Sequence, residues 1–182
     1  MAEPPLKYLA LGDSSSGASS RRKAWPSLLA RRLAKATGRL VSLEIAGSVG
    51  SSTEELIRTE LAKLDSLAPD FVTVSIGAAD VEQGRSRAEY QAGLEWIYDS
   101  VVARGLAPGR AVAISIPQPL EGTADMERRA IEHFNTIART EASARALAWV
   151  ELPAAAAAVG DARDAAWAEA IWDSVREAWT AS

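Results

Sequence analysis

The chain has no cysteine and a single histidine, His133, among its 182 residues. The lack of cysteine excludes disulfide bonds, thiolate catalysis and zinc sites built on sulfur, and one histidine cannot form a histidine-rich metal centre. Basic residues are slightly outnumbered, because 20 lysines and arginines against 24 acidic residues give a formal net charge of −4. Without a broad basic surface, neither nucleic acid nor an anionic membrane is an expected partner.

Long apolar runs are also missing. No stretch approaches the roughly 20 residues that a membrane-spanning helix requires, so no membrane span is expected. The first residues, MAEPPLKYLALGD, lack the basic segment and longer apolar segment of a signal peptide, which favours a cytoplasmic location. The content of hydrophobic residues, 48%, suffices for a core, and the length suits one domain over residues 1–182.

Five short apolar runs alternate with longer stretches in which apolar residues recur every three or four positions. Strands are predicted at residues 7–11, 40–45, 71–76, 111–116 and 147–152. Helices are predicted at residues 25–37, 53–64, 88–103, 126–142 and 165–179. This alternation predicts an α/β fold in which helices cover both faces of a five-stranded parallel sheet.

The candidate site lies at the carboxyl ends of the predicted strands, where open α/β sheets bind their ligands. The first strand ends in GDSSSGASS, a small turn that leads into a helix. Ser14 in this turn is a candidate nucleophile whose own N–H would form part of an oxyanion hole. The alternative is that Ser14 and its neighbours only cap the following helix.

Four segments together resemble the SGNH hydrolases, also called GDSL esterases and lipases: YLALGDSSSGA, IAGSVGSSTEEL, VTVSIGAADV and AAWAEAIW. The resemblance implies a three-layer, flavodoxin-like fold with strand order 2-1-3-4-5. It further implies hydrolysis of small acyl esters through an acyl-serine, without a cofactor. By position, Asp13 and Ser14 match the Gly-Asp-Ser block, and Ser14 matches the nucleophile and first oxyanion donor. Gly50 matches the second donor, through its backbone N–H.

The sequence departs from the family pattern at two places. The third block of the family reads Gly-x-Asn-Asp, but here Ala79 replaces the asparagine before Asp80, and a methyl group donates no hydrogen bond. The last block, Asp-x-x-His, has no histidine here. Asp161 and Asp164 fall near the position of its acid, and we interpret both as first-turn residues that favour the dipole of the last helix.

His133 is expected to lie at mid-helix on the surface or in packing contacts, away from Ser14. A serine site without the asparagine and the base is expected to be weak or inactive. Three explanations stay open: a family member that lost its chemistry, an engineered variant, or an enzyme that uses another base.

Two other functions fit parts of the sequence. Arg21, Arg22 and Lys23 follow the serine-rich turn, so the turn is also a candidate site for a phosphorylated ligand such as a flavin nucleotide. Alternatively, tryptophans 167, 172 and 179 form a helical stripe that a partner protein would cover, although such a stripe is more often core. We interpret it as core, with Trp25 and Trp96 packing into the same core from other helices.

Overall fold

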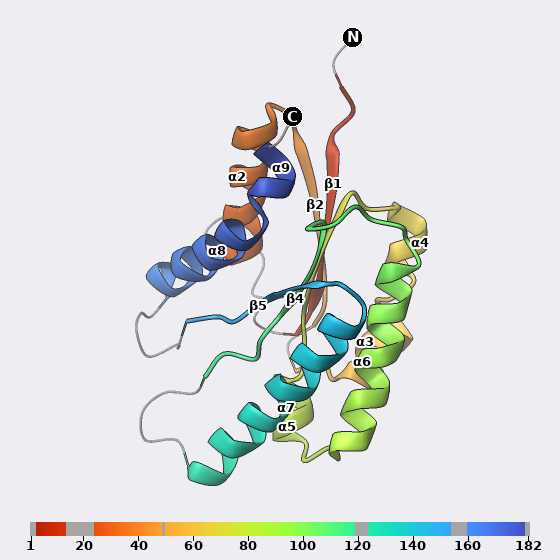
Figure 1. The fold of residues 1–182 in the computed structure, drawn as a ribbon, viewed down its shortest axis with the longest axis vertical. Coiled ribbons are helices and arrows are strands. Elements are labelled where there is room, and N and C mark those ends of the chain that lie inside the picture. The colour runs from red at the N-terminus through yellow and green to blue at the C-terminus, as the bar shows by residue number, and fades with distance from the viewer. Residues whose placement is uncertain (1–2, 14–23, 49, 119–123, 154–159, 181–182) are drawn as a thin grey trace.

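A five-stranded parallel sheet forms the centre of the computed structural model, which describes residues 3–13, 24–48, 50–118, 124–153 and 160–180 (Figure 1). The strands are β1 (Leu6–Gly12), β2 (Val41–Ala46), β3 (Phe71–Ser75), β4 (Ala111–Ile114) and β5 (Ala148–Val150). Their order is β2-β1-β3-β4-β5, and every neighbouring pair is parallel. The predicted α/β fold and strand order are confirmed, with β1 between β2 and β3.

Helices cover both faces of this sheet, so that the domain has three layers (Figure 1). On one face lie α2 (Trp25–Thr37), α8 (Asp161–Val175) and α9 (Glu177–Thr180). On the other lie α3 (Thr53–Thr59), α4 (Lys63–Leu67), α5 (Ala78–Glu82), α6 (Arg87–Val102) and α7 (Asp125–Ala144). No helix among the described residues is long and apolar enough to cross a membrane.

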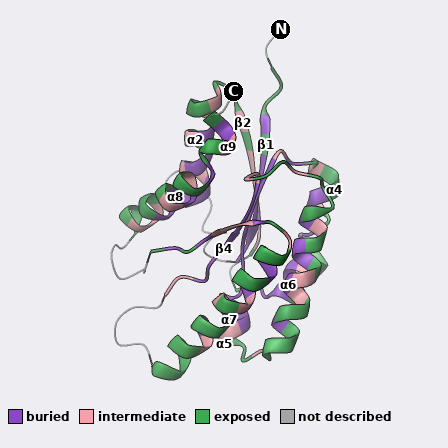
Figure 2. Cartoon of the chain, viewed as in Figure 1, coloured by how far each residue is buried: buried purple, intermediate pink, exposed green. Residues whose placement is uncertain are grey.

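Side chains of β1 alternate between the two hydrophobic cores, as the pleat of a strand requires. Leu6, Tyr8 and Ala10 pack in the core beneath α2, α8 and α9. Leu9 and Leu11 pack in the core beneath the helices of the opposite face. Figure 2 shows the consequence: the central strands are buried, and exposed residues follow the outer sides of the helices. A strand buried on both faces is therefore a rigid support for the turn that follows it.

The helix predicted at residues 53–64 is divided into α3 and α4. Leu56, Leu61 and Leu64 all enter the same core. The N–H of Leu61 reaches back five residues to the carbonyl oxygen of Leu56 at 3.0 Å, a wide turn that redirects the chain. The sequence pattern also missed α5, a five-residue helix in the loop after β3.

The tryptophans follow the prediction except for Trp96. Trp25, Trp167 and Trp179 are buried, and Trp172 packs against the same core. Trp96, however, is 63% exposed, so its predicted place in the core is wrong. The buried stripe of α6 consists of Tyr90, Leu94, Ile97, Tyr98 and Val101. Trp96 lies off this stripe, and the helical period places it on the outer side.

Candidate active site

The carboxyl ends of β1, β2 and β3 carry most of the predicted site residues that the structure describes. Asp13, directly after β1, is 4% exposed, and its N–H donates to the carbonyl oxygen of Ser75 at 3.0 Å. This bond extends the pairing of β1 with β3 up to the turn. Ser14 and the basic residues 21–23 lie outside the described residues, so their predicted roles stay predictions.

The loop after β2 passes very close to the end of β1. A Cβ atom placed on Gly47 would lie 1.8 Å from the carbonyl oxygen of Gly12. Only glycine permits this approach, and it brings the loop that carries Gly50 against the end of β1. The sequence segments around Gly12 and Gly50 are therefore neighbours in space.

Gly50 lies in a tight turn just before α3. The N–H of Ser51 donates to the carbonyl oxygen of Ser48 at 3.1 Å, and Gly50 has a φ of 78°. A positive φ at the third residue of such a turn favours glycine. Gly50 is exposed, whereas Ser51 and Ser52 are buried. The predicted backbone donor therefore lies at the surface of an anchored loop.

The loop after β3 is held by a second close approach. Gly77 has a φ of 126°, and a Cβ there would lie 2.6 Å from the hydroxyl oxygen of Tyr90. That hydroxyl donates to the carbonyl oxygen of Ile76 at 3.3 Å. Ala79 follows in the first turn of α5 and is buried, with 3% exposure. Its methyl group provides no hydrogen-bond donor at the position where the resemblance implied an asparagine.

Asp80 joins the β3 loop to the start of α3. Its fully buried carboxylate accepts hydrogen bonds from the N–H of Thr53 at 3.0 Å and from the Thr53 hydroxyl at 2.7 Å. The guanidinium of Arg85 lies 4.0 Å away. Burial raises the pKa of Asp80, while the bonds from Thr53 and the charge of Arg85 lower it, and the net direction is upward. Asp80 thus positions two loops of the predicted site relative to each other.

The last predicted block does not provide a histidine, and its two acids differ in their surroundings. Asp161 is exposed at the start of α8, and residues 154–159 before it lie outside the described part of the chain. Asp164, one turn later, accepts a hydrogen bond from the N–H of Trp25 at 3.0 Å. Both acids lie in the first turn of α8, as the sequence predicted.

His133 lies on the outer side of α7. Its ring nitrogen Nδ1 accepts a hydrogen bond from the Arg87 guanidinium at 2.8 Å, and the residue is exposed. The sequence predicted a surface or packing role for His133, and the structure places it at the surface. Among the described residues, no group of three or more histidine, aspartate or glutamate side chains could hold a metal ion.

Sequence reasoning missed Asn135, the only asparagine of the chain. Its side chain accepts from the N–H of Ile116 at 2.7 Å and donates to the carbonyl oxygen of Ile116 at 2.9 Å. The side chain of Asn135 therefore makes the two hydrogen bonds to Ile116 that the backbone of a neighbouring strand would make. Ile116 lies just beyond the end of β4, where the loop toward the site begins. The sequence offered one signal for this role, which is that the polar Asn135 directly follows the apolar Phe134 and precedes Ile137 in the predicted helix.

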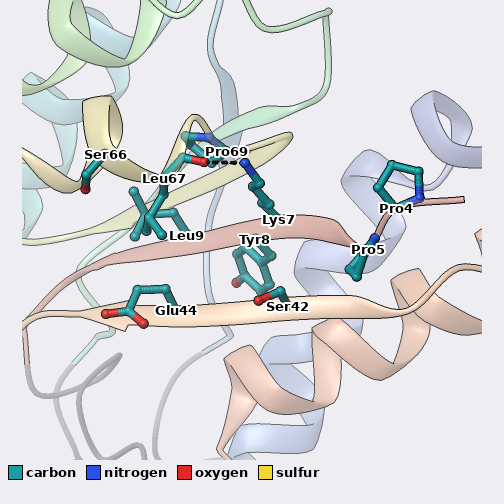
Figure 3. A pocket seen from close by; sticks show the side chains of 10 residues that line it. All are labelled: Pro4, Pro5, Lys7, Tyr8, Leu9, Ser42, Glu44, Ser66, Leu67 and Pro69. Atoms are coloured by element: carbon teal, nitrogen blue, oxygen red, sulfur yellow. Dashed lines mark hydrogen bonds between the residues drawn. The ribbon is translucent and has the colours of Figure 1, made fainter.

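A cavity of about 330 Å³ lies at the opposite end of the sheet (Figure 3). Lys7, Tyr8, Ser42 and Pro69 belong to its lining, and they come from the beginnings of strands or from segments just before them. Ligands of open α/β sheets bind beyond the carboxyl ends of the strands instead. This cavity is therefore not the candidate active site.

Solved structures share this fold. TesA has a TM-score of 0.74 and 21% identity, over 93% of this chain and 98% of its own. A variant of Axe2, an acetyl xylan esterase from Geobacillus stearothermophilus, has a TM-score of 0.76 and 17% identity, over 96% of both chains. The psychrotrophic esterase EstA from Pseudoalteromonas sp. has a TM-score of 0.71 and 16% identity, over 94% of this chain and 97% of its own. No curated protein matches the sequence significantly.

The family comparison covers nearly the whole domain. The model of the GDSL-like lipase/acylhydrolase family matches residues 10–174, from within β1 to within α8. This range includes the Gly50 turn and the β3 loop, which lie at the same edge of the sheet as the end of β1. The chain therefore belongs to the GDSL-like lipase/acylhydrolase family.

Proposed function

We propose that this protein is a carboxylic ester hydrolase that forms an acyl-enzyme on Ser14 and works slowly. The observation that carries the proposal is the family match over residues 10–174, which includes every segment of the predicted site up to the start of α8. The Ser14 oxygen attacks the ester carbonyl carbon, and the bond to the alcohol oxygen breaks. The alcohol leaves with a proton, and water then releases the acid and restores Ser14.

The oxyanion of this reaction would be bound by two backbone donors. These are the N–H groups of Ser14 and Gly50, and the close contact between Gly47 and Gly12 supports the pairing of their loops. Ala79 contributes no third donor. Loss of one oxyanion donor costs roughly 10²–10³ in rate.

The general base is the weaker part of the machinery. With Asp161 taken as the acid of the last block, Asp164 stands three residues later, where the family pattern has histidine. Its carboxylate accepts a bond from the N–H of Trp25, which supports a structural role. His133, the only histidine, accepts from Arg87 on the outer side of α7. Loss of the base from a serine triad costs about 10⁴–10⁶ in rate, so we expect only slow turnover.

Small acyl esters are the proposed substrates. Two of the structural neighbours are described as an esterase and an acetyl xylan esterase. The test is hydrolysis of p-nitrophenyl acetate by the protein and by Ser14→Ala, with stopped-flow detection of any burst of nitrophenol. A slow turnover that Ser14→Ala lowers to the solution rate supports the proposal. A fast turnover, or one that Ser14→Ala leaves unchanged, contradicts it.

A further inference from the structure

A groove of about 530 Å³ lies between the beginning of α6 and the first half of α7. Both helices begin at the edge of the sheet that holds the candidate active site, and they pack side by side (Figure 1). Arg85 connects the two places, since its side chain lines the groove and also lies 4.0 Å from Asp80. The groove is therefore a separate surface next to the β3 loop.

Two cations of the groove have no acidic partner among the described residues. Arg85 pairs with Glu54, but Arg87 and Arg129 form no ion pair with any described carboxylate. Both are exposed, and Asp125 is the one acid among the described residues that lines the groove. Arginine presents several N–H donors in a fork that matches the oxygens of phosphate and carboxylate groups. The groove thus has an unbalanced positive charge suited to an oxyanion.

The contact of Arg87 with His133 fixes the form of the histidine ring. A guanidinium can only donate hydrogen bonds, so Nδ1 of His133 accepts at 2.8 Å. The proton of the neutral ring is then on Nε2, and His133 belongs to the groove lining. This bond orients Arg87, and no described carboxylate neutralises its charge.

Apolar surface lies beside these donors. Met126 is 82% exposed in the first turn of α7, which is uncommon for a large apolar side chain. Phe134 also lines the groove, although it is only 5% exposed, and its ring stacks on Tyr90 with centroids 4.3 Å apart. A ligand in this groove would therefore meet positive charge and apolar surface together.

We propose that this groove binds a small organic anion. Its phosphate or carboxylate group contacts Arg87, Arg129 and His133, and its apolar part lies against Met126 and Phe134. The volume is within the usual range of small-molecule sites, roughly 300–1,000 Å³. The proposal does not depend on catalysis by Ser14, and it concerns residues distinct from the basic segment 21–23.

The single histidine makes a direct test possible, because its ring signals in a proton NMR spectrum need no assignment by mutation. Phenyl phosphate, inorganic phosphate and phenol are titrated at constant pH and ionic strength. Phenyl phosphate is expected to shift the His133 signals with saturation, inorganic phosphate with weaker affinity, and phenol not at all. No saturable shift with phenyl phosphate, or an equal response to phenol, overturns the proposal.

Ligand-observed NMR with charge-matched variants measures the contribution of the arginines. Arg87→Gln with Arg129→Gln is expected to weaken phenyl phosphate binding about 10-fold or more, since one hydrogen bond to a charged group contributes about 1.5–3 kcal/mol. Arg58→Gln with Arg176→Gln changes the net charge equally on exposed sites elsewhere and is expected to bind normally. Equal weakening by both pairs, or binding only to vesicles of anionic lipid, overturns the proposal. If the variant with both Arg87→Gln and Arg129→Gln does not fold, the same binding measurement is made with Arg129→Gln alone.

Discussion

Asp164 in the first turn of α8 accepts a hydrogen bond at 3.0 Å from the backbone N–H of Trp25, the first residue of α2. The residue before α2, Ala24, offers no side-chain cap. A carboxylate from a distant part of the chain thus satisfies a donor at the start of this helix and also interacts favourably with its dipole. The segment that ends the family match is joined in this way to the helix that follows the Ser14 turn.

Removal of this contact is expected to lower stability. Asp164→Ala should reduce the free energy of unfolding by about 1 kcal/mol, as loss of an N-terminal cap does, whereas Asp164→Asn keeps an accepting oxygen and loses less. Urea denaturation measures both. Asp173→Ala, on the exposed side of the same helix, is the control and should change stability little. Equal stability of Asp164→Ala and the unmodified protein would show that the contact contributes nothing.

Asn135 is expected to contribute more to the stability of the fold than other polar residues of α7. Asn135→Ala leaves both the N–H and the carbonyl of Ile116 without their partner and should cost roughly 1–3 kcal/mol. Thr136→Ala, which removes only a bond within α7, is the matched control. Thermal and urea unfolding compare the two, and similar losses would contradict the role of Asn135 as a strand mimic.

The buried carboxyl of Asp80 predicts a pH dependence with a definite sign. Its pKa in the folded protein is raised above the ordinary value of 3.8, mainly by burial, so the folded state holds the proton more tightly than the unfolded state. Stability relative to Asp80→Asn should therefore fall as pH rises from 3.8 through the raised pKa and then stay constant. Urea unfolding of both proteins between acid and neutral pH measures the difference. A relative stability that increases with pH contradicts the assignment.

An asparagine amide at position 79 is expected to raise the rate of ester hydrolysis only a little. Ala79→Asn adds a donor to a buried position beside the predicted oxyanion, but a donor accelerates only a reaction that already proceeds. The rate of p-nitrophenyl acetate hydrolysis should rise modestly or not detectably. A gain on the order of 10³ would show that a competent base is already present.

The apolar runs of the sequence predicted the five strands and the helices on both faces of the sheet, because such runs indicate burial. The strand order came from the resemblance to the SGNH hydrolases. The sequence did not predict the contacts that join distant segments. Asp164 meets Trp25 across 139 positions and Asn135 meets Ile116 across 19, and no local pattern encodes such pairs. Trp96 was predicted in the core, although the helical period of the buried residues of α6 places it on the outer side.

Parts of the site followed from local chemistry and parts did not. The resemblance to the SGNH hydrolases singled out Gly50 as a backbone donor, which stays a prediction, and the positive φ of Gly50 agrees with a turn. The bond between Asp80 and Thr53 depends on packing of the β3 loop against α3, which only the folded chain provides. Ser14 lies outside the described residues, so its role as the nucleophile is tested by its reactivity.

Reaction of the protein with a fluorophosphonate tests the central claim most directly, with the label located by peptide mass because Ser15 and Ser16 adjoin Ser14. The account predicts slow labelling of Ser14 at neutral pH, absent in Ser14→Ala and unchanged in Asp161→Asn and Asp164→Asn. Slow labelling follows because a serine reacts when a base takes its proton, and no histidine occupies the last block. Rapid stoichiometric labelling of Ser14 that either aspartate variant abolishes would contradict the account and identify a serine–carboxylate hydrolase.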